Sequence, residues 1–142
     1  MKNRKGLTVV ELLVAVVVFA LLVTVLVPGL GSFFARLEAH AALRTVTAGL
    51  SAARYQAISD NQPVRAEIVS AKLLLSQDLG LGWQVIRSFD LGRKVEIRAN
   101  SRPVFSPLGN VSPLCTITLL QERRVWRVVV SMYGRVKVYG KG

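Results

Sequence analysis

The sequence has few of the residues that most often build metal or disulfide sites. It contains one cysteine, Cys115, and one histidine, His40, among 142 residues. An internal disulfide is therefore excluded, and a zinc site of the usual composition lacks its second histidine or its cysteine pair. We expect Cys115, which lies in an alternating apolar run, to be a small buried residue rather than a reactive thiol.

Acidic residues are also scarce. The sequence contains eight Asp and Glu and nineteen Lys and Arg, which gives a net charge of +11. Asp60, Asp78 and Asp90 each stand beside turn residues and are interpreted as turn or cap formers. No glycine-rich phosphate loop follows a strand and opens a helix. We therefore expect no enzymatic activity, no metal and no cofactor, and a basic surface that attracts polyanions such as nucleic acid or anionic envelope polymers.

A long uncharged run stands out against this basic background. No charged residue occurs from Leu12 to Val27, and the run counted from Leu7 has 21 residues. As a helix it would be about 31 Å long, enough to cross a hydrocarbon core of about 30 Å. We expect a single membrane-spanning helix in the inner (cytoplasmic) membrane. The Lys and Arg bias of residues 2–5 places the N-terminus in the cytoplasm and the rest of the chain outside.

Glu11 is unusual because it lies inside this apolar stretch. An ionised carboxylate there costs about 2–3 kcal/mol, so a functional role with a nearby partner is expected. Residues 7–27 contain no Lys, Arg or His that could pair with it. The sequence therefore predicts a cation from another molecule.

The segment from Gly6 to Leu13, with the basic leader before it, resembles the processing site of type IV prepilins and type II secretion pseudopilins. The resemblance implies that a prepilin peptidase cleaves between Gly6 and Leu7 and methylates the new N-terminus. It also implies that Glu11 neutralises the N-terminal amine of a neighbouring pilin or pseudopilin in the filament. Leu7 departs from the usual Phe. Loss of the three basic leader residues would leave a net charge of +8.

Two other interpretations account for the same stretch. A secretory signal has a shorter apolar core, of about 7–15 residues, and a small-residue cleavage site, which is not evident here. A plain signal anchor would give a single-pass, membrane-anchored basic envelope protein with no filament role, and it leaves Glu11 unexplained.

Beyond the apolar run, Pro28 and the glycines that follow predict a kink or a melted turn. The helix then resumes with one apolar stripe, formed by Leu43, Val46, Leu50, Ala53 and Ala57. Turn formers and Pro63 predict its end near Ser59. We expect a leader at residues 1–6, a transmembrane and assembly helix at 7–32, and a soluble domain at 33–142 that includes the amphipathic half of the helix.

After Pro63 the apolar pattern changes to a period of two, which is typical of strands. We predict seven short strands, near residues 64–69, 83–88, 94–99, 102–105, 114–120, 125–131 and 135–139. Residues 72–76 are ambiguous between a strand and a helical turn. Loops of hairpin length predict an antiparallel sheet. The expected fold class is α+β, with the long N-terminal helix packed on a C-terminal antiparallel sheet.

Residues 54–64 resemble the helix-to-strand junction of the GspH/FimT branch of the pilin family, and residues 105–109 and 129–136 resemble its later strands. This implies a minor pilin or minor pseudopilin, and the features are common to type IV pilus and type II secretion subunits. The cysteine pair of many pilins is missing. A C-terminal aspartate cluster is also missing, so the calcium site of major pseudopilins is not expected.

The last predicted strand is basic. Alternation places Arg135, Lys137 and Tyr139 on one face, with Val136 and Val138 toward the core. This resembles the basic C-terminal segment through which some FimT-like pilins bind DNA. The candidate DNA-binding residues are Arg135, Lys137 and Lys141, and the secondary candidates are Arg123, Arg124 and Arg127. The alternative is a solvated strand face of a structural subunit.

Overall fold

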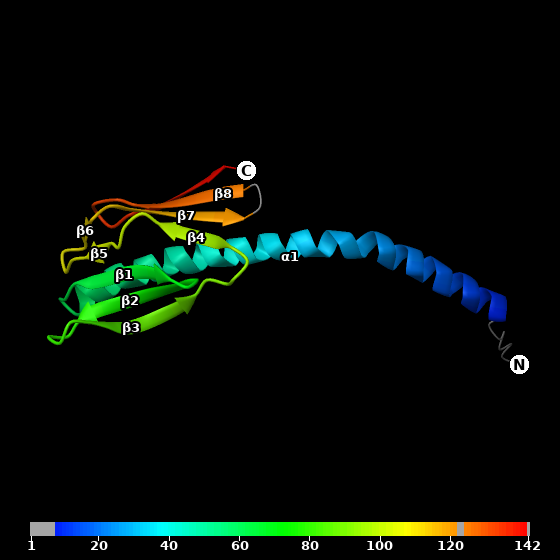
Figure 1. Cartoon of the computed structure of the whole chain (residues 1–142), viewed down its shortest axis with the longest axis horizontal. Helices are drawn as coiled ribbons and strands as arrows, with labels where there is room; N and C mark the ends of the chain where they lie inside the picture. Colours follow the sequence, from blue (N-terminus) through cyan, green and yellow to red (C-terminus); the bar gives the residue numbers. More distant parts are fainter. Residues whose placement is uncertain (1–7, 122–123, 142) are drawn as a thin grey trace, which may run out of the picture. The chain divides into compact units, whose positions relative to one another are not determined.

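The computed structural model describes the backbone of residues 8–121 and 124–141, and within these ranges the side chains of all residues except 26–30, 32 and 141. This part of the chain forms one helix and nine strands (Figure 1). In chain order they are α1 (Val9–Ser59), β1 (Val64–Val69), β2 (Lys72–Asp78), β3 (Trp83–Asp90), β4 (Glu96–Ala99), β5 (Val104–Phe105), β6 (Val111–Ser112), β7 (Cys115–Gln121), β8 (Arg124–Val130) and β9 (Val136–Lys141).

The chain divides into two compact units, residues 1–36 and 37–142. The described part of the first unit is helical from Val9 onward, and α1 is unbroken at Pro28 and Gly29. The predicted melted turn is therefore wrong. A proline removes one backbone hydrogen bond, while the residues on both sides keep theirs, so the helical path continues.

The predicted membrane span, residues 7–32, lies only partly within the described chain. Leu7 is outside it, as are the side chains of residues 26–30 and 32. Among the residues that the structure describes, no helical segment combines the length and the apolar character needed to cross a membrane.

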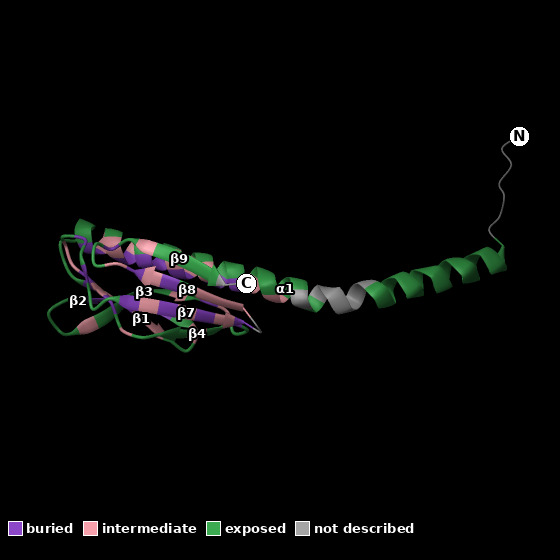
Figure 2. Cartoon of the chain, turned by 90° about the horizontal axis from the view of Figure 1, so that it is seen from above, coloured by how far each residue is buried: buried purple, intermediate pink, exposed green. Residues whose placement is uncertain are grey.

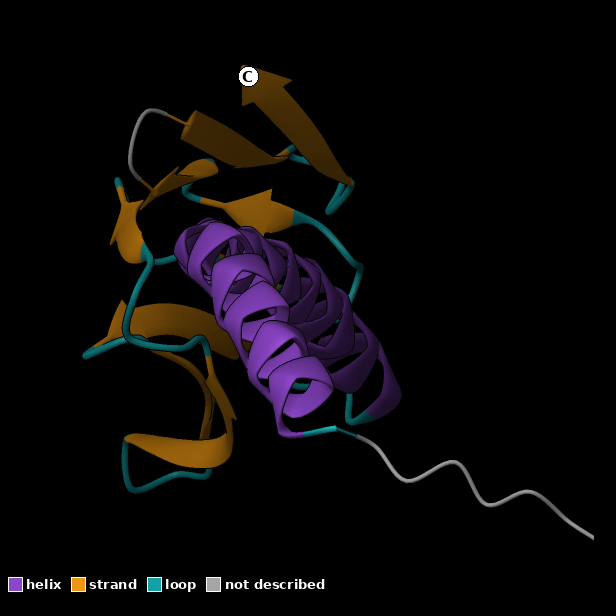
Figure 3. Ribbon diagram, turned by 90° about the vertical axis from the view of Figure 1, so that its right-hand side faces the viewer, coloured by secondary structure: helices purple, strands orange, loops and turns teal. Residues whose placement is uncertain are grey.

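The second unit contains the part of α1 from residue 37 to residue 59. Strands lie on two sides of this part of the helix (Figures 1 and 3). One sheet has five strands in the order β3-β2-β1-β5-β6, and the other has four in the order β4-β7-β8-β9. Every pairing is antiparallel, as predicted. The strands form two sheets rather than one because β4 pairs with β7 and not with its neighbour in sequence, β3.

The predicted apolar stripe of α1 forms the centre of the core. Val46, Leu50, Ala53 and Ala57 are fully buried, and Leu43 packs against them. Figure 2 shows buried positions along α1 and on the strands packed around it. Gly49 permits the closest approach, because a Cβ built on it would stand 2.4 Å from Leu73 Cδ2 of β2. A glycine within a helix costs roughly 0.5–1 kcal/mol relative to alanine, and here it gives β2 room to pack.

Residues 72–76, which were ambiguous between a strand and a helical turn, belong to strand β2. It lies between β1 and β3, and its Leu73 and Leu75 are 1% exposed. Strand β3 is at the edge of its sheet and exposes both faces, so Val85 is 58% exposed despite its alternating pattern. Strand β6 was not predicted, because two residues are too few to show a period.

Cys115 is buried at the start of β7, as predicted. Its thiol donates a hydrogen bond to the Ser101 carbonyl oxygen at 3.4 Å. Burial raises the pKa of the Cys115 thiol, and the hydrogen bonding with Ser101 offsets part of that increase. The thiolate that would act as a nucleophile is therefore disfavoured.

We expect the chain from residue 34 onward to fold alone as a soluble monomer, because it keeps the helical stripe that covers both sheets. Urea unfolding should show one cooperative transition. Leu50→Ala in this fragment should lower the free energy of unfolding by about 2–5 kcal/mol, whereas Arg44→Ala, at an exposed position of the same helix, should change it by less than about 0.5 kcal/mol. A fragment without a cooperative transition would contradict the predicted boundary.

Candidate functional site

The N-terminal end of α1 is closed by Thr8 and Glu11. The Thr8 backbone N–H donates to Glu11 Oε2 at 3.1 Å, and the Glu11 N–H donates to Thr8 Oγ1 at 3.2 Å. The Thr8 hydroxyl donates to the same carboxylate oxygen at 3.2 Å. This reciprocal arrangement is a capping box, which satisfies two backbone donors that the first helical turn leaves free. Gly6 and Leu7, the predicted processing site, lie outside the described residues.

The capping box fixes the Glu11 carboxylate at the positive end of the helix dipole. Its hydrogen-bond partners all belong to Thr8, which is neutral, and no cation among the described residues forms an ion pair with it. The sequence analysis assigned Glu11 a role in assembly and did not predict the cap. The spacing Thr8-x-x-Glu11 before an apolar run was the signal that also predicts the cap.

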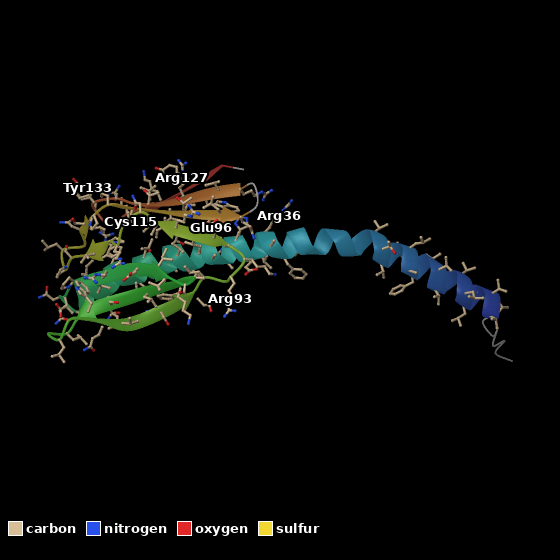
Figure 4. The ribbon with its side chains drawn as sticks, viewed as in Figure 1. Arg36, Arg93, Glu96, Cys115, Arg127 and Tyr133 are labelled. Atoms are coloured by element: carbon tan, nitrogen blue, oxygen red, sulfur yellow. The ribbon has the colours of Figure 1, made fainter. Side chains whose placement is uncertain are left out.

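The second candidate region is the hairpin of β8 and β9. Their register pairs Arg127 with Tyr139 and Val129 with Lys137. Residues paired across strands lie on the same face, so Arg127, Lys137 and Tyr139 share one face of the four-stranded sheet. Figure 4 shows Arg127 on the side of this sheet that points away from α1. The structure thus brings Arg127 into the basic face that the sequence left undecided.

The opposite face of β9 turns toward the core. Val136 pairs with the buried Val130 and packs against the core, and Val138 pairs with the buried Val128. Val138 is nevertheless 44% exposed, because β9 is the last strand of its sheet and has a neighbour on one side only. The predicted alternation is confirmed, while the predicted burial of Val138 is wrong.

The remaining basic candidates do not all lie on this face. Arg135 lies just before β9, and its backbone N–H donates to Ser131 Oγ at 3.1 Å. Lys141 pairs with Val125 in the strand, and its side chain lies outside the described residues, as does Arg123. Arg124 pairs with the buried Gln121, so it is on the face opposite Arg127.

The basic residues of this hairpin are not neutralised within the described chain. The ion pairs found there join Lys94 to Glu38, Arg98 to Glu96 and Arg102 to Glu67. None of these pairs includes Arg127, Arg135 or Lys137. Positive charge that has no carboxylate beside it remains available to an external anion.

A hollow of about 360 Å³ lies beside this hairpin. It is lined by Ser51, Arg54, Tyr55, Gly134, Arg135, Val136 and Lys137. The structure therefore brings Arg54 of α1 next to two of the predicted DNA-binding residues. The sequence analysis did not assign Arg54 to a site. No local motif could have done so, because about 80 residues of chain separate it from Arg135.

The histidine and the aspartates considered for catalysis pack against a ring or form turns. The His40 ring is edge-on to the Trp126 ring at a centroid distance of 5.9 Å. Asp78 Oδ1 accepts hydrogen bonds from the N–H groups of Gly80 and Gly82, and Asp90 Oδ1 accepts one from Gly92, which confirms both as turn formers. Within residues 8–121 and 124–141, no three His, Cys, Asp or Glu side chains come together as a metal site would require.

Comparisons with known proteins agree with the N-terminal motif and the fold. The family model described as the prokaryotic N-terminal methylation motif matches residues 1–27. A search of curated protein sequences finds no match. A crystal structure of the type IV minor pilin FimU from Pseudomonas aeruginosa is similar with a TM-score of 0.59 and 18% identity, over 70% of this chain and 91% of FimU.

The minor pseudopilin EpsH of the type II secretion system of Vibrio cholerae is similar with a TM-score of 0.63 and 17% identity, over 72% of this chain and 96% of EpsH. At these identities the likeness establishes the fold. The chain thus carries the N-terminal methylation motif of prokaryotic prepilins and has the pilin fold shared by FimU and EpsH.

Proposed function

We propose that this protein is a minor pilin or minor pseudopilin, a structural subunit of a type IV pilus or a type II secretion pseudopilus, which binds DNA through its basic C-terminal strand. The observation that carries the filament role is the match of the methylation motif to residues 1–27 in a chain with the pilin fold. On this proposal residues 7–32 anchor the chain in the inner membrane, and the domain that follows lies outside the cytoplasm.

The proposal gives Glu11 a specific task. The processed chain begins with the free amine of Leu7, and the carboxylate of a neighbouring subunit neutralises that amine. An α-amino group has a reference pKa near 8 and is mostly protonated at neutral pH. In a medium of low dielectric constant, its attraction to a carboxylate exceeds the surface value of about 1 kcal/mol. The cap on Thr8 supports this task by fixing where the carboxylate stands.

Processing should depend on Gly6, because the peptidase must admit the residue before the cleaved bond into a narrow site. Gly6→Val should leave an uncleaved precursor that keeps Lys2 to Lys5. Mass spectrometry of the N-terminal peptide from membranes measures this directly. A wild-type protein that begins anywhere other than Leu7 would favour a secretory signal or a plain anchor instead.

Assembly should depend on the charge of Glu11 rather than on its capping role. Glu11→Gln loses the charge but keeps a side chain that can close the capping box. Thr8→Ala keeps the charge and removes the cap, at a cost of about 0.5–2 kcal/mol. We expect Glu11→Gln to insert in the membrane and fail to co-purify with filaments, and Thr8→Ala to assemble. The reverse pattern would assign Glu11 a purely structural role at the helix end.

The proposed DNA contact rests on the face that Arg127, Lys137 and Tyr139 share and on the unpaired Arg135 beside it. The exposed cations of a strand form a fairly rigid row that backbone phosphates can meet. Such contacts release counterions and carry little sequence information. Tyr139 is 55% exposed, which leaves its ring free to stack on a base if single strands bind.

Replacing Arg135 and Lys137 together by Gln should weaken binding to all duplex sequences alike. The slope of log affinity against log salt should be roughly 2–3 in the wild type and fall by about 2 in the variant. The measurement is a salt titration of the full chain in uncharged detergent micelles. The matched control is Arg36→Gln with Arg44→Gln, which removes the same charge at exposed helix positions. Equal losses in both variants would show that only net charge matters and that the strand is a solvated face.

A further inference from the structure

Arg54 is a cation without a partner in the described structure. Its side chain is half-buried, and its Nε atom is buried without a hydrogen bond. No ion pair among the described residues includes it. A buried donor that lacks an acceptor costs about 1–3 kcal/mol, and such groups are rare enough in folded proteins that each requires an explanation.

Two glycine turns lie close to the Arg54 guanidinium. Gly109 and Gly134 have φ angles of +79° and +70°, which side-chain-bearing residues rarely adopt. A Cβ on Gly134 would stand 2.8 Å from Arg54 Nε, and one on Gly109 would stand 3.2 Å from the same atom. Glycine is thus required at both positions, for the backbone and for the space. A half-buried arginine with such close neighbours loses less conformational freedom when it binds an anion than a fully exposed arginine does.

The hollow beside the hairpin is open to Arg54 and carries only positive or neutral polar groups. Arg135 and Lys137 line it from the hairpin, and Tyr55 and Ser51 line it from α1. No carboxylate is among the lining residues. The Ser51 hydroxyl donates to the Thr47 carbonyl oxygen at 2.9 Å, so its remaining capacity is as an acceptor. Three cations therefore line one cavity, and none of the described lining residues is a carboxylate that could serve as their counterion.

We propose that this hollow binds one phosphate group, with Arg54 as the inner, fixed cation and with Arg135 and Lys137 at its rim. A guanidinium presents its N–H donors in a planar fork that matches the oxygens of phosphate. The inference deepens the proposed DNA function, because a phosphodiester of the backbone that runs along the hairpin would supply the group. Arg54 then gives the DNA a half-buried contact beside the exposed cations of the hairpin.

The first experiment measures DNA binding by the full chain in uncharged detergent micelles. Arg54→Gln should reduce the salt slope by about 0.9 and lower affinity roughly five- to tenfold. Arg44→Gln, an equal loss of charge at an exposed position of the same helix, should change affinity less than twofold. Arg54→Lys keeps the charge but loses the fork, so its affinity should fall between those of Arg54→Gln and the wild type. Suppose that Arg54→Gln binds DNA with the same affinity as Arg44→Gln, while replacing Arg135 and Lys137 still weakens binding. That result would overturn the phosphate pocket and leave the proposed function intact.

The second experiment tests the pocket without DNA. Inorganic phosphate should raise the thermal midpoint of the wild-type chain and of Arg44→Gln by more than chloride of equal ionic strength does, and it should not do so for Arg54→Gln. This result in a protein that does not bind DNA would support the pocket and refute the DNA function. An equal effect of acetate would indicate a protein carboxylate as the ligand and overturn the phosphate assignment, as would no difference between phosphate and chloride. If Arg54→Gln does not unfold cooperatively, Arg54→Lys carries both comparisons.

Discussion

The rest of the domain depends on the close approach of α1 to strands on two of its sides. Small residues make this approach geometrically possible: Gly49 leaves no room for even one more carbon against Leu73, and Ala53 and Ala57 are fully buried. Larger side chains at these positions would hold the strands away from the helix and open voids along it. Burial of the larger residues Leu50 and Val46 on the same helix then supplies the apolar area that stabilises the arrangement.

This packing determines where chemistry can occur. Because residues 37–59 of α1 occupy the space between the sheets, the side chains buried there are mostly apolar, and most polar groups are directed outward or to the margins where a sheet meets the helix. Arg54 and Arg135 meet at such a margin although they are far apart in sequence. The cavity is lined by α1 and by the continuous segment from Gly134 to Lys137, and the turn at Gly109 approaches Arg54 from a further loop. A domain whose core is filled in this way offers its surface as the place for recognition.

Much of this architecture could be predicted from residue patterns. The apolar stripe predicted the buried face of α1 because the stripe is periodic. Pro63 with the preceding turn formers predicted the end of α1 at Ser59 because that signal is local. The division of the strands into two sheets could not be predicted, since the pairing of β4 with β7 joins segments that are distant in sequence. The exposure of Val85 and Val138 was missed for a related reason: alternation shows which face a residue is on, but not whether its strand is at an edge. The same limit applied to the site, where alternation placed Lys137 and Tyr139 correctly and nothing local pointed to Arg54.

The position of β9 at the margin of its sheet has a further consequence. Its outer side presents backbone N–H and C=O groups that no strand of the described chain satisfies, and such an edge can pair with the same edge of a second molecule. In the proposed filament, subunits would be crowded together, which would favour that pairing. Lysines at residues 137 and 141 would bring like charges together if two copies aligned there. The cations proposed to attract DNA would therefore also keep neighbouring domains from fusing into a continuous sheet, so that contacts along the filament are left to the helices.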